Sequence, residues 1–194
     1  MAHEKTETHS MPIPRLLGYL DWIYLREALK ATDTYFEDAL SKTNDENEIK
    51  NINATRQTLY RASFISICAT IEQNLDEMVR LQQQKQKKKI SPSDLKHRGI
   101  KRSIVYANKV LERNIDTKKQ CWKDAELLQE LRNKLVHDGP GFPGKSENKK
   151  LCVALNNTNY VSFNPGPYFS REQLNNTIDL FKECLRGYRE SKSA

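Results

Sequence analysis

The chain has 194 residues, a formal net charge of +7 and only 37% hydrophobic residues. This length allows one domain with a real core, or at most two small ones. The low apolar content favours long amphipathic helices that expose one face. The sequence contains no run of about eighteen apolar residues, so we expect no membrane-spanning helix and no membrane partner.

The N-terminal half predicts a flexible tail and two long helices within a single domain. Residues 1–14 are expected to form the tail, and residues 15–190 one helical domain. Residues 15–40 carry apolar side chains at helical spacing, whereas the polar stretch 41–53 predicts a loop or a frayed helix end. Residues 54–84 give the strongest helical pattern. The apolar positions of the first helix are Leu16, Leu20, Ile23, Ala28, Ala31, Tyr35 and Ala39. Those of the second are Ile65, Cys68, Ile71, Leu75, Met78 and Val79.

Two further helices are predicted in the middle of the chain. The sequence Ser-Pro-Ser-Asp at 91–94 has the cap and the first-turn proline of a helix start. A basic helix is expected from there to about Arg113, with Gly99 as a bend or as the end of a short first piece. The next helix covers 122–137 and stops at Gly139, which is followed by proline. The inward positions are expected at Ile100, Ile104, Ala107 and Leu111, and then at Trp122, Ala125, Leu128, Leu131 and Leu135.

The C-terminal part predicts a small β-hairpin and a last helix. Two short apolar runs, 151–155 and 160–163, flank an Asn-rich turn and predict the hairpin. Residues 164–167 read as a loop. Residues 170–173 resemble a capping box that begins a helix running to about Tyr188. Its inward positions are Leu174, Ile178, Phe181 and Leu185. The expected fold is therefore all-α, an up-and-down bundle of about five helices with a small β-hairpin before the C-terminal helix.

The N-terminus and the cysteines both indicate a cytoplasmic protein. The first ten residues are polar and acidic, which is unlike a secretory signal. The four cysteines show no C-x-x-C spacing, so we expect reduced thiols rather than a disulfide framework. They are Cys68, Cys121, Cys152 and Cys184.

Positive charge is concentrated in one segment. Residues 80–123 contain 14 Lys or Arg against three acidic residues, a local balance of +11, so the rest of the chain is net negative. Such asymmetry is typical of a surface that faces a polyanion. The alternative is a solvated helical face that includes a basic tract.

Three polar residues near the end of the 122–137 helix are the best candidates for a functional site. Arg132 is a permanent cation with a planar donor fork, and it lies at the edge of the apolar stripe. His137 belongs to the residue type that most often handles protons in proteins, and Asn133 lies one turn before it on the same face. An arginine and a histidine here could instead only complement the helix dipole. On the preceding long helix, Glu72 falls inside the apolar stripe and needs a donor or cationic partner.

The motif Arg-Asn-x-x-x-His at the end of a late helix, in an all-α chain of this size, resembles the HEPN superfamily (higher eukaryote and prokaryote nucleotide-binding domains). The segment LRNKLVHDG at 131–139 is similar to that family's helix-to-loop junction. Segment 61–79, which includes Glu72, is similar to its long earlier helix. The likeness covers residues 16–188. HEPN toxins paired with a nucleotidyltransferase antitoxin tend to carry a tyrosine where this chain has Gly139, which argues against that pairing.

The resemblance implies a metal-independent endoribonuclease that acts as a homodimer with a composite site. In this reading His137 is the acid/base, Arg132 the phosphate clamp and Asn133 the orienting residue, while Glu72 holds Arg132 in place. The ribose 2′-OH is the nucleophile, so the expected products carry 2′,3′-cyclic phosphate and 5′-OH ends. No metal-ligand spacing or Gly-rich phosphate loop is found, and no cofactor is expected. The residues expected to attract RNA are Lys85, Lys87, Lys88, Lys89, Lys96, Arg98, Lys101 and Arg102.

The expected context is a toxin or an antiviral defence effector, with an antitoxin or regulatory protein as a further partner. Two alternatives stay open. A non-catalytic HEPN module could bind RNA, a nucleotide or a protein partner through the same face. A plain helical dimerisation domain would explain the apolar stripes but not the segment of charge +11.

Overall fold

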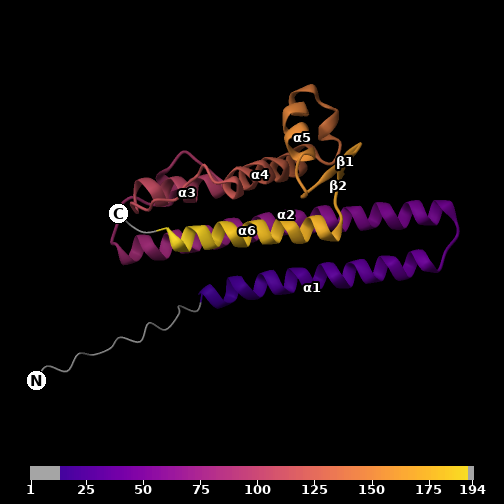
Figure 1. Ribbon diagram of the computed structural model, residues 1–194, viewed down its shortest axis with the longest axis horizontal. Coiled ribbons are helices and arrows are strands. Elements are labelled where there is room, and N and C mark those ends of the chain that lie inside the picture. The colour runs from indigo at the N-terminus through magenta and orange to yellow at the C-terminus, as the bar shows by residue number, and fades with distance from the viewer. Residues whose placement is uncertain (1–13, 192–194) are drawn as a thin grey trace, which may run out of the picture.

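The computed structural model describes the backbone of residues 14–191 and the side chains from Leu20 onward. Within this part the elements are α1 (Pro14–Ser41), α2 (Glu46–Lys85), α3 (Gly99–Lys109), α4 (Gln120–Asp138), α5 (Lys149–Asn156), β1 (Ser162–Asn164), β2 (Gly166–Tyr168) and α6 (Arg171–Glu190) (Figure 1). The predicted all-α bundle with a small hairpin before the last helix is confirmed. Among these helices, none combines the length and the apolar character needed to cross a membrane. Of the tail predicted at 1–14, only Pro14 lies within the described residues, and it begins α1.

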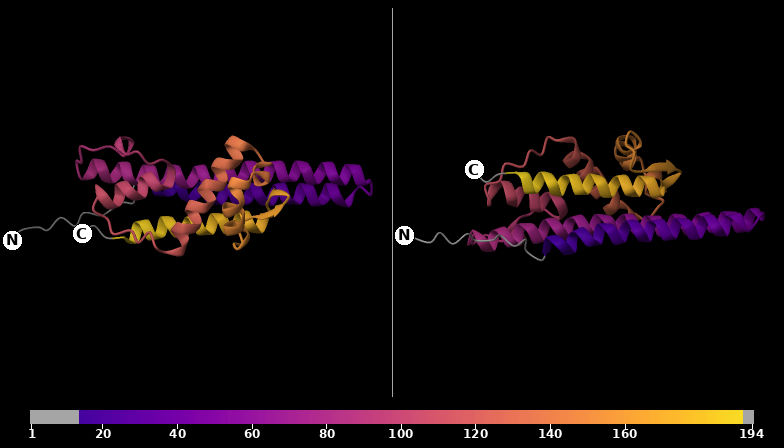
Figure 2. Two further views of the ribbon diagram at one scale, coloured as in Figure 1. Left: turned by 90° about the horizontal axis from the view of Figure 1, so that it is seen from above. Right: turned by 60° about the horizontal axis from the view of Figure 1, so that its bottom comes forward.

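α1 and α2 form a long antiparallel hairpin along which the other helices lie. Both views of Figure 2 show this hairpin extending well beyond α6 and the β-hairpin. The predicted loop or frayed end at 41–53 is too long, because α1 ends at Ser41 and α2 already begins at Glu46. The Asp45 side chain caps it by accepting hydrogen bonds from the backbone N–H groups of Asn47 (2.8 Å) and Glu48 (2.9 Å). Polar residues there reflect a solvent-exposed helix end rather than a break.

The inward face of α1 differs from the prediction by about one position. Trp22, Leu29 and Phe36 are buried at seven-residue intervals, the spacing of a helix that touches its partner along one narrow seam. Ile23 and Tyr35, which were predicted to face inward, are 40% and 68% exposed. The predicted Leu16 lies outside the residues whose side chains are described.

A polar cluster around Asp33 ties α1 to α2 and α6. The Asp33 carboxylate accepts hydrogen bonds from the Arg56 guanidinium (2.5 Å) and from the Tyr60 hydroxyl. Arg171 at the start of α6 lies 3.3 Å from its other oxygen. The side chains of Asp33 and Arg56 are only 14% and 19% exposed. Because a buried carboxylate is costly without partners, this cluster fixes where the three helices meet.

Two buried tyrosines are expected to make the folded chain less stable at high pH. Burial raises the pKa of Tyr60 and Tyr188 to about 12, and the hydrogen bond to Asp33 adds to the increase for Tyr60. A free tyrosine has a pKa of about 10, so the unfolded chain loses these protons first. Stability is therefore intact below about pH 10 and falls as the pH rises towards 12. Urea midpoints at pH 9 and pH 11.5 should show this loss, and Tyr188→Phe should reduce it. An equal loss in the variant would contradict the prediction.

The basic helix predicted to begin at 91–94 is shorter than expected. The capping box at Ser91 begins a 3₁₀ turn (Pro92–Asp94), the chain is then extended, and α3 starts only at Gly99, whose φ is +58°. The predicted inward residues of α3 are all buried. Arg113 follows α3 and is turned inward: its guanidinium donates to the Tyr188 carbonyl (2.6 Å) and lies 4.7 Å from that residue's ring. Arg113 thus caps the end of α6 and is withdrawn from the cationic surface.

The predicted hairpin is displaced along the chain. Residues 151–155 belong to α5, so the first predicted strand is wrong. The actual hairpin pairs Phe163 with Pro167 across a turn at Pro165, so the stretch predicted as a loop supplies the turn and part of β2. A five-residue apolar run cannot be assigned to strand or helix from its pattern alone.

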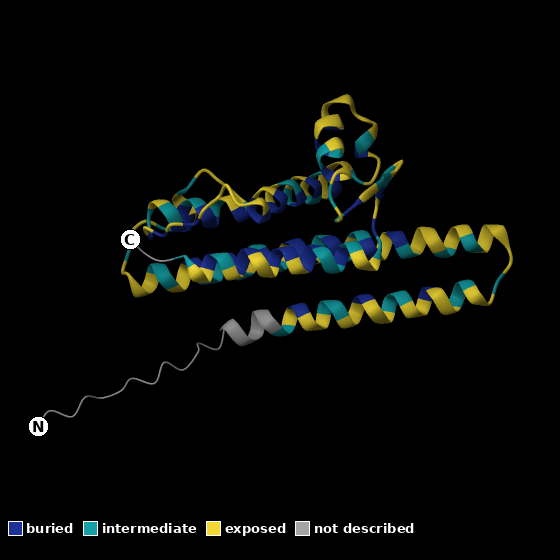
Figure 3. Ribbon diagram, in the orientation of Figure 1, coloured by how far each residue is buried: buried dark blue, intermediate teal, exposed yellow. Residues whose placement is uncertain are grey.

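The predicted start and inward face of α6 are confirmed. The Ser170 hydroxyl accepts from the Gln173 backbone (3.1 Å) while the Gln173 side chain accepts from the Ser170 N–H (2.9 Å). The four predicted inward residues of α6 are buried against α2 and α4, where Figure 3 shows the helices in dark blue. The cysteines are all unpaired, and only Cys152 is not fully buried.

Candidate functional site

α4 carries the Arg-Asn-x-x-x-His motif, and its buried face holds the motif in place. Leu128, Leu131 and Leu135 pack into the core, as predicted. The helix ends at Gly139, whose φ of +69° is a conformation that glycine adopts without strain. The flank of the last two turns is therefore exposed on a rigid helix.

Arg132 lies at the boundary between the core and this exposed flank. Its Nη1 donates a hydrogen bond to the Asn133 Oδ1 atom (3.0 Å). Its Nε atom is buried and has no partner in the described part of the chain. Burial raises the pKa of the Cys68 thiol above its usual range; the charge of Glu72 adds to this shift and that of Arg132 opposes it. Arg132 and Glu72 therefore both lie near Cys68 on α2.

The partner of Glu72 differs from the one expected. Its carboxylate accepts a hydrogen bond from the Gln129 side chain, and no ion pair joins it to Arg132 among the residues described. Gln129 lies one turn before Arg132 on α4. Glu72 can therefore position Arg132 only indirectly, by holding Gln129 and with it the helix α4 that carries Arg132. Sequence reasoning missed Gln129, although its place three residues before Arg132 put it at the same edge of the helix.

His137 lies in the last turn of α4 and is exposed. Over residues 14–191 its imidazole takes part in no recorded hydrogen bond or ion pair. The structure brings Arg132 and Asn133 together by direct contact, and helical spacing places His137 one turn beyond Asn133 on the same flank. An arginine, an amide and a histidine open to solvent can together bind an oxyanion and exchange a proton with it.

Two other cations at this end of α4 are neutralised by carboxylates. Lys134 lies 3.6 Å from Asp138 and 3.8 Å from Glu147, and Lys145 lies 2.9 Å from Asp138. The hydrogen bond from Lys145 is the main reason that the pKa of Asp138 is below its usual value. Arg132 alone among these cations has no carboxylate partner within the described residues.

The predicted RNA-binding residues fall into two groups. Gly99 at the start of α3 packs against the site, because a Cβ atom added there would lie 3.5 Å from Gln129 and 3.6 Å from Glu72. The residues that this start of α3 carries are Lys96, Arg98, Lys101 and Arg102, of which Arg102 is paired with Asp76. The residues at the distant end of α2 are Lys85, Lys87, Lys88 and Lys89, of which Lys88 lies 3.0 Å from Glu112.

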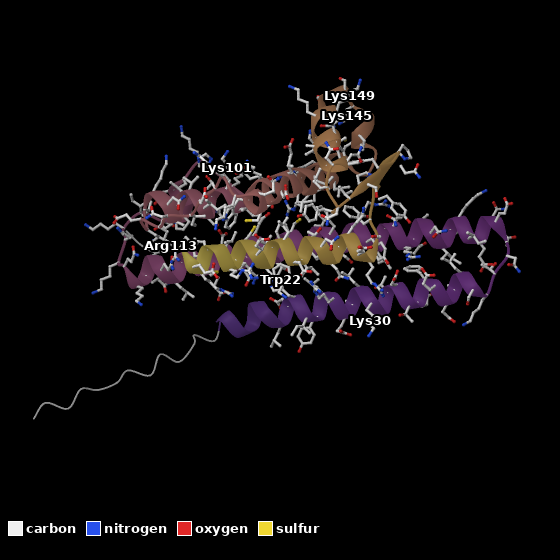
Figure 4. The ribbon with its side chains drawn as sticks, viewed as in Figure 1. Trp22, Lys30, Lys101, Arg113, Lys145 and Lys149 are labelled. Carbon is white, nitrogen blue, oxygen red and sulfur yellow. The ribbon has the colours of Figure 1, made fainter. Side chains whose placement is uncertain are left out.

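Two further lysines lie near the motif and were missed. Lys149 and Lys150 are exposed on α5, which packs against α4. Figure 4 shows Lys149 and Lys145 on this side of the molecule, Lys101 on α3 and Lys30 on the distant α1. Lys149 and Lys150 were missed because residues 151–155, which follow them in α5, were predicted to form a strand.

Comparisons with known proteins neither add to nor restrict this geometry. No protein-family model matches the chain, and no curated protein or solved structure matches it either. The arrangement of the side chains therefore carries the functional argument.

Proposed function

We propose that this chain is a metal-independent endoribonuclease of HEPN type that acts as a homodimer. One observation carries the proposal: among the described residues, the half-buried cation Arg132 forms a hydrogen bond only with Asn133 and no ion pair, whereas the neighbouring Lys134 and Lys145 are bound to carboxylates. Such a guanidinium is available for an external anion. A phosphodiester presents two oxygens that match its planar fork.

The reaction follows from the groups at hand. In RNA the 2′-OH attacks the adjacent phosphorus, and the bond to the 5′-oxygen breaks on the opposite side. His137 removes the proton from the 2′-OH or protonates the leaving oxygen. Arg132, oriented by Asn133, stabilises the charge that develops on the non-bridging oxygens. The products carry a 2′,3′-cyclic phosphate and a 5′-OH.

A second copy of the chain completes the site in this proposal. The attacking 2′-oxygen and the leaving 5′-oxygen lie on opposite sides of the phosphorus, so a single imidazole cannot serve both at once. A partner subunit would supply the second histidine and a second arginine. Sedimentation that shows only monomer at high micromolar concentration would count against this composite site. The cellular role that fits such an enzyme is that of a toxin or an antiviral effector.

The test compares wild type with His137→Ala on total RNA and on tRNA in the presence of EDTA. We expect cleavage by the wild type, cyclic-phosphate ends, and a rate about 100-fold lower in the variant. Equal cleavage by both proteins, or no cleavage of any RNA by the wild type, would contradict the nuclease assignment. Tight RNA binding without cleavage would instead favour a non-catalytic binding module.

A further inference from the structure

We propose that the lysines at the C-terminal end of α2 form a second RNA-binding surface, far from Arg132, which makes the enzyme selective for RNA chains long enough to reach both. We call Lys85, Lys87 and Lys89 the α2-end lysines. The inference rests on the proposed function, because Arg132 is taken as the point of cleavage.

The α2-end lysines are held on an ordered turn rather than on a frayed end. The backbone N–H groups of Lys87 and Lys88 donate to the carbonyls of Gln84 and Gln83, both at 3.1 Å. The Gln83 side chain also donates to the Ile90 carbonyl (3.1 Å). That carbonyl accepts a further hydrogen bond from the hydroxyl of Tyr106 on α3. Because the turn is fixed on two helices, little conformational entropy is lost when the lysines bind a ligand.

These lysines also carry uncompensated charge. All three are exposed, and none forms an ion pair with another described residue. The nearby carboxylates are already engaged: Glu112 binds Lys88, and Asp94 accepts the Ser91 N–H in its capping box. Three available cations on one turn attract a polyanion without regard to its sequence.

The separation between the two surfaces sets the length of RNA required. α4 runs antiparallel to α2 (Figure 1), and the hydrogen bond from Gln129 to Glu72 joins the two helices. Cys68, one turn before Glu72, therefore lies near Arg132, one turn after Gln129, and Lys85 follows Cys68 by 17 residues of continuous helix. At 1.5 Å per residue this corresponds to about 25 Å. A stacked nucleic-acid strand advances 3.4 Å per phosphate, so about seven nucleotides cover this distance. A shorter RNA reaches the site but not the α2-end lysines.

The experiment measures binding of 4- and 20-nucleotide single-stranded RNAs by fluorescence anisotropy, in a His137→Ala background so that the RNA stays intact. The test variant is Lys85→Gln/Lys87→Gln/Lys89→Gln. The control removes the same charge from exposed lysines on other faces, as Lys30→Gln/Lys50→Gln/Lys182→Gln. At about 0.1 M salt we expect the test variant to bind the 20-mer about tenfold more weakly, with a salt slope smaller by about 2. Binding of the 4-mer should not change, and the control should stay within about twofold.

A loss of equal size for both RNA lengths, or an equal loss in the control, would overturn the second surface. Circular dichroism confirms that each variant is folded before binding is measured. The same lysine substitutions in the active chain then separate the two proposals. Length-dependent binding without any cleavage leaves the second surface standing and removes the nuclease. Cleavage that does not depend on RNA length or on the α2-end lysines leaves the nuclease standing and removes the second surface.

Discussion

Replacing Arg132 by alanine is expected to slow RNA cleavage by roughly 100- to 1000-fold, the loss typical of removing one donor that stabilises transition-state charge. Arg132 is placed for this task because its Nε atom is buried while its guanidinium, among residues 20–191, has only Asn133 as a hydrogen-bond partner. The substitution removes no ion pair of the fold. The variant should therefore unfold at nearly the same urea concentration as the wild type. Single-turnover cleavage of a defined RNA gives the rate.

The chain offers a matched control two residues away on the same helix. Lys134 is a cation of similar exposure, but it is paired with Asp138 and Glu147. Lys134→Ala should change the cleavage rate by less than about threefold, since the charge of Lys134 is already bound by Asp138 and Glu147 and is not free to hold a phosphate. Arg132→Lys should recover only part of the activity, because an ammonium group lacks the two-pronged fork that fits a phosphate. Equal losses in Arg132→Ala and Lys134→Ala would show that net charge, and not the clamp, is what matters.

The helices that could be predicted from the sequence are those whose signals are local. α6 was found with its cap, its inward face and its end, because a capping box and an unbroken apolar stripe lie within one segment. α1 was found as a helix, but its buried face was misplaced. The alanines and tyrosines of α1 also follow helical spacing, and only contact with α2 decides that Trp22 and Leu29 are buried instead. Tertiary contacts thus selected between two patterns that the sequence contains.

The same distinction applies to the candidate site. Asn133 and His137 are four residues apart on one helix, so their spacing alone predicts a common face, with Arg132 beside Asn133 at its edge. The partner of Glu72 depends on how α4 packs on α2, and for that reason Gln129 was missed. The segment of charge +11 could be recognised from composition. Which cations of this segment are free and which are bound could not be predicted, since Arg113 and Arg102 meet their partners only in the folded chain.

Asp33→Ala is expected to destabilise the fold strongly while leaving the candidate site untouched. Asp33 is nearly buried, and its loss leaves the Tyr60 hydroxyl without its acceptor and the Arg56 guanidinium with only the exposed Glu37 as an ion-pair partner among the described residues. Removing one member of such a buried pair costs about 3 kcal/mol. For a chain of this size that corresponds to a fall in Tm of roughly 10 °C.

Glu37 provides the comparison for this prediction, because it binds the same arginine from the surface. Its carboxylate lies 2.8 Å from Arg56, but its side chain is 62% exposed. Glu37→Gln should therefore lower Tm only slightly, as exposed ion pairs contribute little. Cleavage by Asp33→Ala, measured well below its lowered Tm, should match the wild type, because Asp33 lies on α1 and shares no contact with the motif on α4. A large fall in cleavage at unchanged Tm would mean that the α1–α2 hairpin takes part in the reaction, and that the candidate site extends beyond α4.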